Sequence, residues 1–216
     1  MDFDLTSEQK EYQELANNFS AKELKPYAAK WDKESFFPKE TLAKAGELGF
    51  LSLYVDTSLG GMGLGRLDAS IIFEQLAKGC TSTTAFMTIH NMATWMVSKY
   101  ATKELKAEWF PHLSQGKKLA SYCLTEPGSG SDAVSLTTQA RKEGNSHFIL
   151  NGSKSFISGG STSDVYAVMC RTGESGANGI SCLLVEAGTE GLSFGAKEKK
   201  MGWNTQHTAA VHFDNC

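Results

Sequence analysis

The feature that most constrains the fold of this 216-residue sequence is a change of pattern just past its middle. In the first part, apolar residues recur at helical spacing; Tyr12, Leu15 and Phe19, for example, lie on one face of a helix. In the second part, which holds 13 of the 21 glycines, β-branched residues alternate with polar ones. The sequence therefore predicts an α+β multidomain chain, with an all-helical domain over residues 1–117 and an all-β domain over residues 118–216.

The first part contains recognisable helix ends. Thr6 and Gln9 have the spacing of a capping box, and Pro26 breaks or kinks the helix that they open. A second helix is expected to begin near Pro38 and to end at Gly49. After a glycine-rich connector, the pattern predicts three further helices, over residues 67–78, 83–99 and 103–113.

The second part predicts short strands. The first is expected over residues 119–124, and two others, 134–142 and 147–150, flank residues 143–146, which are typical of a hairpin turn. The remaining strands are expected at residues 165–171, 180–186, 192–194 and 209–213. Short strands separated by turns favour a sandwich or barrel over a parallel sheet.

Composition argues against several classes of partner. A net charge of −3 disfavours nucleic acid or an anionic membrane surface, and no apolar run approaches the roughly 20 residues of a membrane helix. The acidic start has no apolar core typical of an export signal, although a removed presequence remains open. The five cysteines are scattered without a Cys-x-x-Cys pair, which favours reduced thiols. The five histidines lack metal-ligand spacing, so we expect no metal site.

Residues 122–132 (YCLTEPGSGSD) have the composition of a binding loop. Pro127 fixes one φ angle, and Gly128 and Gly130 are expected to allow backbone conformations that a Cβ would forbid. The hydroxyl groups of the loop belong to Thr125, Ser129 and Ser131. Such a loop can direct several amides at one anion, but it has neither the dinucleotide fingerprint nor the ending of a phosphate loop. A cradle for a phosphate or heterocycle and an ordinary surface turn both remain open.

Taken together, three segments resemble the acyl-CoA dehydrogenase family. They are residues 122–132, residues 151–159 (NGSKSFISG) and residues 199–203 (KKMGW), in the family's order and spacing. Residues 59–65 and 79–84 are similar to that family as well, so the resemblance covers essentially the whole chain. Further segments look most like a branched-chain member that acts in valine breakdown: residues 80–84, 89–92 and 168–171.

The resemblance implies an activity and its partners. Family members remove two hydrogens from the α and β carbons of an acyl-CoA thioester: a glutamate takes the proton and FAD accepts the hydride. For this chain it implies a short branched-chain acyl-CoA substrate, electron-transferring flavoprotein as electron acceptor, and, for the full-length protein, a homotetramer in the mitochondrial matrix. It implies no nucleic-acid partner and no membrane insertion.

The resemblance also assigns FAD-binding residues. They are Tyr122, Cys123, Leu124, Thr125, Glu126, Pro127, Gly128, Ser129, Gly130, Ser131, Phe156, Ile157 and Ser158. Residues 122–125 would lie along the isoalloxazine, and Ser131 would lie near both the pyrophosphate and the acyl-CoA chain, which makes it the one substrate-binding residue. Phe156 would pack against the ring and Ser158 would present a donor near N5, whereas Glu126 would be structural. From the residues alone, Phe156 could equally be a β-domain core residue and Ser158 a turn hydroxyl.

The family's catalytic glutamate usually lies in a C-terminal helical domain that this chain does not resemble, so we assign no catalytic residue here. The chain is then a fragment, a truncated gene product or a non-catalytic paralogue. Three functions stay open: an acyl-CoA dehydrogenase, an acyl-CoA oxidase, and a non-catalytic binding or interaction module.

Overall fold

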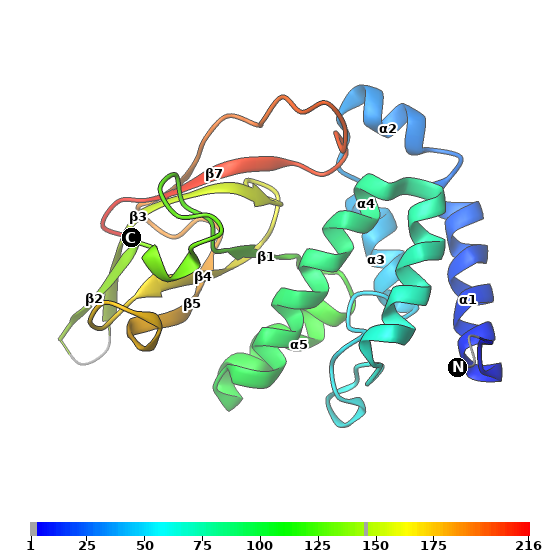
Figure 1. Cartoon of the computed structure of the whole chain (residues 1–216), viewed down its shortest axis with the longest axis horizontal. Coiled ribbons are helices and arrows are strands. Elements are labelled where there is room, and N and C mark those ends of the chain that lie inside the picture. Colours follow the sequence, from blue (N-terminus) through cyan, green and yellow to red (C-terminus); the bar gives the residue numbers. More distant parts are fainter. Residues whose placement is uncertain (1–3, 145–146) are drawn as a thin grey trace. The chain divides into compact units, whose positions relative to one another are not determined.

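The computed structural model describes residues 4–144 and 147–216, which form two compact units (Figure 1). The helical unit comprises Met1–Lys118 and Lys200–Gln206, and the β unit comprises Leu119–Lys199 and His207–Cys216. The predicted order, helices first and a β domain second, is confirmed. Residues 200–206, which the sequence pattern placed with the β domain, make their contacts with the helices.

The described residues of the helical unit form five α-helices. They are α1 (Ser7–Phe19), α2 (Ala28–Glu34), α3 (Lys39–Glu47), α4 (Arg66–Tyr100) and α5 (Lys103–Ser114). The capping box of α1 is confirmed, because Thr6 and Gln9 exchange two bonds of 3.1 Å between side chain and backbone. A π-helical turn, Ser20–Leu24, continues α1 and ends before Pro26. The helix predicted after Pro38 is α3.

Helix α4 replaces two predicted helices. Residues 66–100 form one assigned helix, but Cys80 has non-helical angles, φ −152° and ψ 98°, so the axis is kinked there. The residue before the kink lies against the turn that follows α1: a Cβ on Gly79 would be 2.4 Å from Ser20 Oγ. The glycine therefore permits a close approach of two helical segments. The fully buried side chains of this unit include Leu24, Leu42, Phe50, Ile72, Leu76 and Phe86.

Residues 200–206 are fixed to the helical unit by hydrogen bonds. The backbone and side-chain nitrogens of Asn204 donate to the carboxylate of Asp32, at 3.0 and 3.1 Å. The amide of Gln206 donates to Ser82 Oγ at 3.0 Å. This short segment is thus part of the helical unit although it comes between two strands of the β unit.

The β unit contains a seven-stranded sheet. Its strands are β1 (Ala120–Cys123), β2 (Gln139–Glu143), β3 (His147–Ser158), β4 (Val165–Arg171), β5 (Ile180–Glu186), β6 (Leu192–Phe194) and β7 (Thr208–Phe213). The order is β1-β4-β2-β3-β7-β6, and β5 also pairs with β4. Most pairs are antiparallel, but β1 and β2 both pair with β4 in parallel, so the sheet is mixed. The strand predicted over residues 134–142 is wrong in its first half, because Ala133–Ser135 form a 3₁₀ turn.

Strand β3 pairs with two partners. Its first half pairs with β2, and the register Glu143 to His147 confirms the predicted hairpin, whose turn residues 145–146 lie outside the described residues. Its second half, from Gly152 to Ser158, pairs with β7. The register shifts between Lys154 and Ile157, so two residues of β3 bulge out of the ladder. Strand β3 is therefore much longer than the four residues that the sequence pattern predicted.

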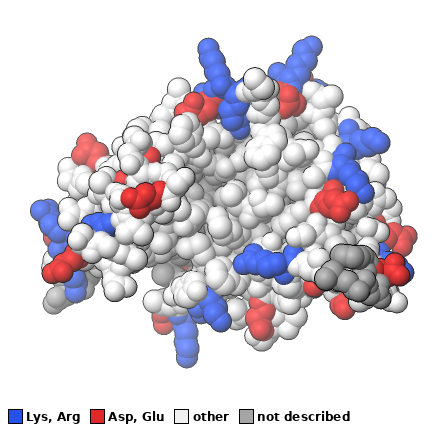
Figure 2. Space-filling model, in the orientation of Figure 1, with Lys and Arg blue, Asp and Glu red and all other residues white. Residues whose placement is uncertain are grey.

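Surface charge is mixed in sign. On the face shown in Figure 2, Lys and Arg side chains are interspersed with Asp and Glu side chains. Within the described ranges, 4–144 and 147–216, no helix combines the length and apolarity that a bilayer crossing requires.

Candidate functional site

The two separate segments predicted to bind one ligand meet within the β unit. The amide of Ser155 donates to the carbonyl of Thr125 at 2.8 Å, which joins β3 to the loop after β1. Farther along, Ser121 Oγ donates to the carbonyl of Ser158 at 2.5 Å. The last residues of β3 therefore run antiparallel to β1 and to the start of the loop, so that Ser155 lies beside Thr125 and Ser158 lies beside Ser121.

The bulge in β3 presents an aromatic ring to solvent. Phe156 lies between the two registers of the β3–β7 ladder, has a positive φ of 58° and is 68% exposed. A left-handed conformation is costly for a bulky residue, and such strain is concentrated at functional sites. The exposure excludes the interpretation of Phe156 as a core residue. The ring is available to pack against a flat ligand.

Part of the loop is satisfied by its own hydrogen bonds. Glu126 and Ser129 exchange two backbone bonds, of 2.9 and 3.2 Å, and Ser129 Oγ donates to the carbonyl of Asp132 at 2.7 Å. Ser129 is consequently buried, and its hydroxyl and amide are already engaged within the loop. Pro127 and Ser131 are exposed, so Ser131 remains the accessible hydroxyl of this turn.

The two loop glycines differ from the sequence-based expectation. Neither Gly128 nor Gly130 has a positive φ, so the expectation that they adopt a conformation forbidden to other residues is wrong. A Cβ added to either one would meet no atom of the described chain within 4 Å. Neither a positive φ nor a contact with the described part of the chain requires glycine at these positions. What a Cβ would occupy is open space above the loop.

Beneath the loop lies a buried ion pair. Lys154 Nζ is 2.8 Å from Glu126 Oε1, and the two side chains are 0% and 3% exposed. Lys154 also donates to the carbonyl of Leu124 at 3.0 Å. Burial alone would raise the pKa of the Glu126 carboxyl, but hydrogen bonds from Lys154, Thr138 and Thr137 outweigh that effect and lower the pKa to about 2. Glu126 is therefore an anion that faces the interior, as a structural residue would.

Several predicted residues can offer only their main chain. The side chains of Cys123 and Ile157 belong to the buried core cluster of the β unit, and burial raises the pKa of the Cys123 thiol. Tyr122 is half-buried, and desolvation raises the pKa of its phenol. Leu124, Thr125 and Ser158 are partly exposed. The face of the site consists mostly of backbone, hydroxyls and one aromatic ring.

No role was predicted for three residues that hold the two segments together, Lys154, Ser155 and Ser121. A signal for Lys154 existed: it stands four residues after the buried Leu150, and alternate residues of a strand share a face. That parity places Lys154 on the buried face. It was missed because the predicted strand ended at residue 150.

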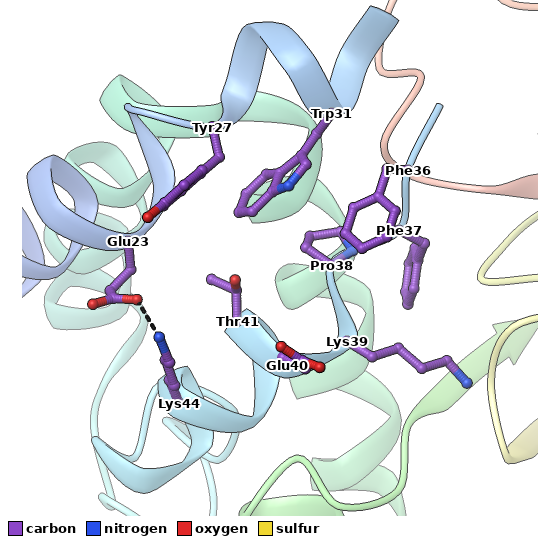
Figure 3. Close-up of a pocket in the computed structure, with 10 residues that line it drawn as sticks. All are labelled: Glu23, Tyr27, Trp31, Phe36, Phe37, Pro38, Lys39, Glu40, Thr41 and Lys44. Carbon is purple, nitrogen blue, oxygen red and sulfur yellow. Dashed lines mark hydrogen bonds and ion pairs between the residues drawn. The ribbon is translucent and has the colours of Figure 1, made fainter. Parts of the chain in front are cut away.

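The helical unit holds a separate cavity of about 480 Å³ (Figure 3). Its lining residues are Glu23, Tyr27, Trp31, Phe36, Phe37, Pro38, Lys39, Glu40, Thr41 and Lys44. The rings of Tyr27 and Trp31 stack at 5.4 Å, and Lys44 pairs with Glu23 at 2.7 Å at the rim. This cavity is lined by none of the residues predicted to bind FAD, so it is distinct from the site in the β unit.

Comparison with known proteins identifies the family. Residues 6–117 match the acyl-CoA dehydrogenase N-terminal domain, and residues 121–216 match the acyl-CoA dehydrogenase middle domain. This chain belongs to the acyl-CoA dehydrogenase family. The resemblance inferred from the three sequence segments is thereby confirmed.

Relatives of this chain are enzymes of the family and extend beyond it in length. The chain is 58% identical over 212 residues to the mitochondrial isobutyryl-CoA dehydrogenase of Bos taurus, covering 98% of this chain and 51% of the relative. A glutaryl-coenzyme A dehydrogenase solved with glutaryl-CoA shares its fold, with a TM-score of 0.93, 31% identity, and coverage of 100% of this chain and 55% of the other. The chain thus spans about half the length of these acyl-CoA dehydrogenases.

FAD is the cofactor of the family, and the residues of this chain fit it. A solved FAD complex of PigA is similar to this chain, with a TM-score of 0.93 and 29% identity. The match covers 100% of this chain and 57% of the PigA chain. In the β unit, the exposed ring of Phe156 and the open space above Gly128 and Gly130 suit a flat heterocycle with a phosphate tail.

Proposed function

We propose that this chain provides part of the FAD site of a mitochondrial acyl-CoA dehydrogenase that acts on a short branched-chain substrate such as isobutyryl-CoA. The observation that carries the proposal is the pairing of residues 121–125 with residues 155–158, the segment that contains Phe156, in one β unit of a family member. The 58% identity to an isobutyryl-CoA dehydrogenase supports the acyl chain and a place in valine breakdown.

The roles proposed for the residues come from the family resemblance, and their placement is compatible with them. The Phe156 ring would cover one part of the flavin, and the main chain of residues 122–125 would line its polar edge. Ser158, near the end of β3, would present its hydroxyl close to N5. Ser131, exposed at the loop tip, would contact the pyrophosphate and the acyl-CoA chain. Donors at the polar edge favour the form of the cofactor that carries more negative charge.

Bound FAD would supply the hydride acceptor for oxidation of the acyl thioester at its α and β carbons. The carboxylate base is expected outside these 216 residues. We therefore assign binding and orientation to this chain, with electron-transferring flavoprotein as the acceptor and a homotetramer in the matrix as the assembly.

Activity is tested on the full gene product. The purified protein is expected to be yellow, and anaerobic isobutyryl-CoA is expected to bleach it faster than straight-chain butyryl-CoA. A flavin that no short acyl-CoA bleaches would overturn the proposal. Stoichiometric hydrogen peroxide during aerobic turnover, without any requirement for electron-transferring flavoprotein, would instead identify an acyl-CoA oxidase. A soluble, colourless product with no affinity for FAD would identify a non-catalytic module.

A further inference from the structure

The buried pair Glu126–Lys154 has a placement that stability alone does not explain. Both side chains are essentially inaccessible, and lysine is almost never fully buried. Removing two charges from water is costly, so apolar residues of similar volume often stabilise a fold as well as a buried pair does. The hydrogen bonds that the pair makes with backbone groups indicate another role.

Strand β3 binds two successive carbonyls of the loop that follows β1, residues 124–132. Lys154 Nζ binds the carbonyl of Leu124 at 3.0 Å, and the amide of the next residue, Ser155, binds the carbonyl of Thr125 at 2.8 Å. Ser155 lies in the bulge, where the ladder to β7 changes register. The lysine and the bulge thus hold two adjacent loop residues, one each.

The bond to Leu124 also orients the next amide. No peptide bond of the described chain is cis, and in a planar trans peptide the N–H points opposite to the carbonyl. Because Lys154 draws the Leu124 carbonyl inward, the N–H of Thr125 points away from Lys154. Lys154 is fully buried, so this N–H faces away from the buried pair, and the function proposed above puts the flavin on that side.

Glu126 keeps the lysine in place. Its Oε1 accepts from Lys154 and from the Thr138 amide at 2.9 Å, and its Oε2 accepts from the Thr137 amide and hydroxyl, both at 2.7 Å. The carboxylate is therefore held by residues before β2 while it fixes the ammonium group. Residues 124–126 are anchored at both ends by this arrangement.

We infer that Glu126 and Lys154 are positioning residues of the cofactor site: Lys154 turns the Leu124 carbonyl inward so that the Thr125 N–H faces the polar edge of the flavin, and Glu126 fixes Lys154. This inference rests on the FAD-binding function proposed above. It assigns to a buried pair, which touches no ligand, control over the affinity and redox potential of the bound flavin.

The test compares four forms of the full protein. Lys154→Met removes the ammonium at nearly constant length, and Glu126→Gln/Lys154→Met removes it without leaving a buried charge unpaired. The double variant decides the matter if the single one fails to fold. The control is Arg171→Met, because Arg171 is another cation of the β unit that binds backbone carbonyls, those of Val134, Leu136, Glu174 and Gly176.

Three measurements separate positioning from general stability. The first is the Kd for FAD, expected to rise at least tenfold in both Lys154 variants. Loss of the charge-assisted bond from Lys154 to the Leu124 carbonyl leaves the Thr125 N–H no longer held towards the flavin. The second is the reduction potential at saturating FAD, expected to become more negative because the amide donor is displaced. The third is exchange of the Ser155 amide without FAD, expected to accelerate. Arg171→Met is expected to lower Tm while changing the Kd less than twofold.

The outcomes distinguish this inference from the proposed function. Wild-type protein that binds no FAD would overturn both. Wild-type protein that binds FAD, together with a Lys154 variant of unchanged Kd and potential, would overturn the inference alone. A fall in Tm with an unchanged potential would show that the pair is structural only, which also overturns it.

Discussion

At the scale of single residues, the site contains residues whose identity the fold does not require. Phe156 is exposed in a left-handed conformation, and a Cβ on Gly128 or Gly130 would meet no atom of the described residues within 4 Å. Residues kept against their own backbone preference, or without any packing reason, indicate a requirement imposed from outside the fold. Two substitutions test this directly.

Phe156→Gly is expected to leave the fold intact or make it slightly more stable. A left-handed conformation costs a non-glycine residue roughly 1–2 kcal/mol, more than the roughly 0.5–1 kcal/mol of entropy that a glycine loses. FAD affinity should fall several-fold, because the aromatic face is lost. The control is Phe148→Gly on the same strand, where φ is not positive: it should lose about 1 kcal/mol of stability and keep its FAD affinity. Denaturant unfolding measures the stability of each variant, and FAD titration measures its affinity. A destabilised Phe156→Gly protein would contradict the claim that Phe156 is strained in the fold.

Gly130→Ala is expected to separate binding from folding. The added methyl group meets no atom of the described residues within 4 Å, so the unfolding free energy should change by less than about 0.5 kcal/mol. FAD affinity should weaken, because the methyl group occupies the space above the loop. Gly152→Ala is the opposite case: its Cβ would lie 2.5 Å from Thr138 Oγ1 at φ 147°, and a loss of about 2 kcal/mol or more is expected. Gly130→Ala protein with unchanged FAD affinity would show that the space is not used.

At the scale of elements, local patterns located most helices and strands correctly but not their pairing. The capping box of α1 and the strands over residues 165–171, 180–186 and 192–194 follow from spacing and composition, and they are confirmed. The parallel pairing of β1 with β4 depends on contacts between residues far apart in sequence, which no local pattern encodes. The same holds for the bulge in β3, whose freed amide bonds to Thr125.

Composition and resemblance predicted the loop residues, which form the solvent-facing part of the candidate site. The supporting part, Lys154 and Ser155, required knowledge of which face of β3 is buried and where its register shifts. The 3₁₀ turn at Ala133–Ser135 was mistaken for a strand because its alternating residues also suit one. Its geometry is fixed by the amide of Ser135, which binds the carbonyl of Asp132 at 3.2 Å.

The close approach of α4 to the π-helical turn after α1 is tested by Gly79→Ala. A methyl group would lie 2.4 Å from Ser20 Oγ and 2.8 Å from the Ser20 carbonyl oxygen, so backbone must move, at a cost of about 1–3 kcal/mol. A gain of up to about 1 kcal/mol in helix propensity offsets only part of this cost. The control is Gly65→Ala, whose Cβ meets only Asp68 Oδ2, at 3.4 Å. Thermal unfolding should show a clear loss for Gly79→Ala alone, and equal Tm values would contradict the packing argument.

At the scale of the whole molecule, each unit has its own core, and the two can be monitored separately. All four tryptophans, Trp31, Trp95, Trp109 and Trp203, lie in the helical unit. The buried pair Glu126–Lys154 lies in the β unit. Tryptophan emission therefore follows the helices, whereas amide exchange in β4 and β5 follows the sheet.

Acid is expected to destabilise the β unit first. The pKa of Glu126 is lowered from 4.5 to about 2 in the fold, so its contribution is present above pH 4.5 and is lost as the pH falls towards 2. The charged group facing it is Lys154, and the loss is on the order of 3 kcal/mol. Amide protection in β4 and β5 should fall before tryptophan emission shifts. In Glu126→Gln this pH-dependent step should disappear; a step of the same size in that variant would assign it to another group.

The short segment from Lys200 to Gln206 has a consequence for protein engineering. Since Asn204 and Gln206 supply donors to Asp32 and Ser82, a recombinant fragment that stops after the last helix would lack groups that complete its own surface. Chimeras between homologous enzymes joined at a single crossover near residue 118 would pair helices from one parent with this segment from the other. A library of such hybrids should recover folded proteins more often when residues 200–206 are exchanged together with the helices.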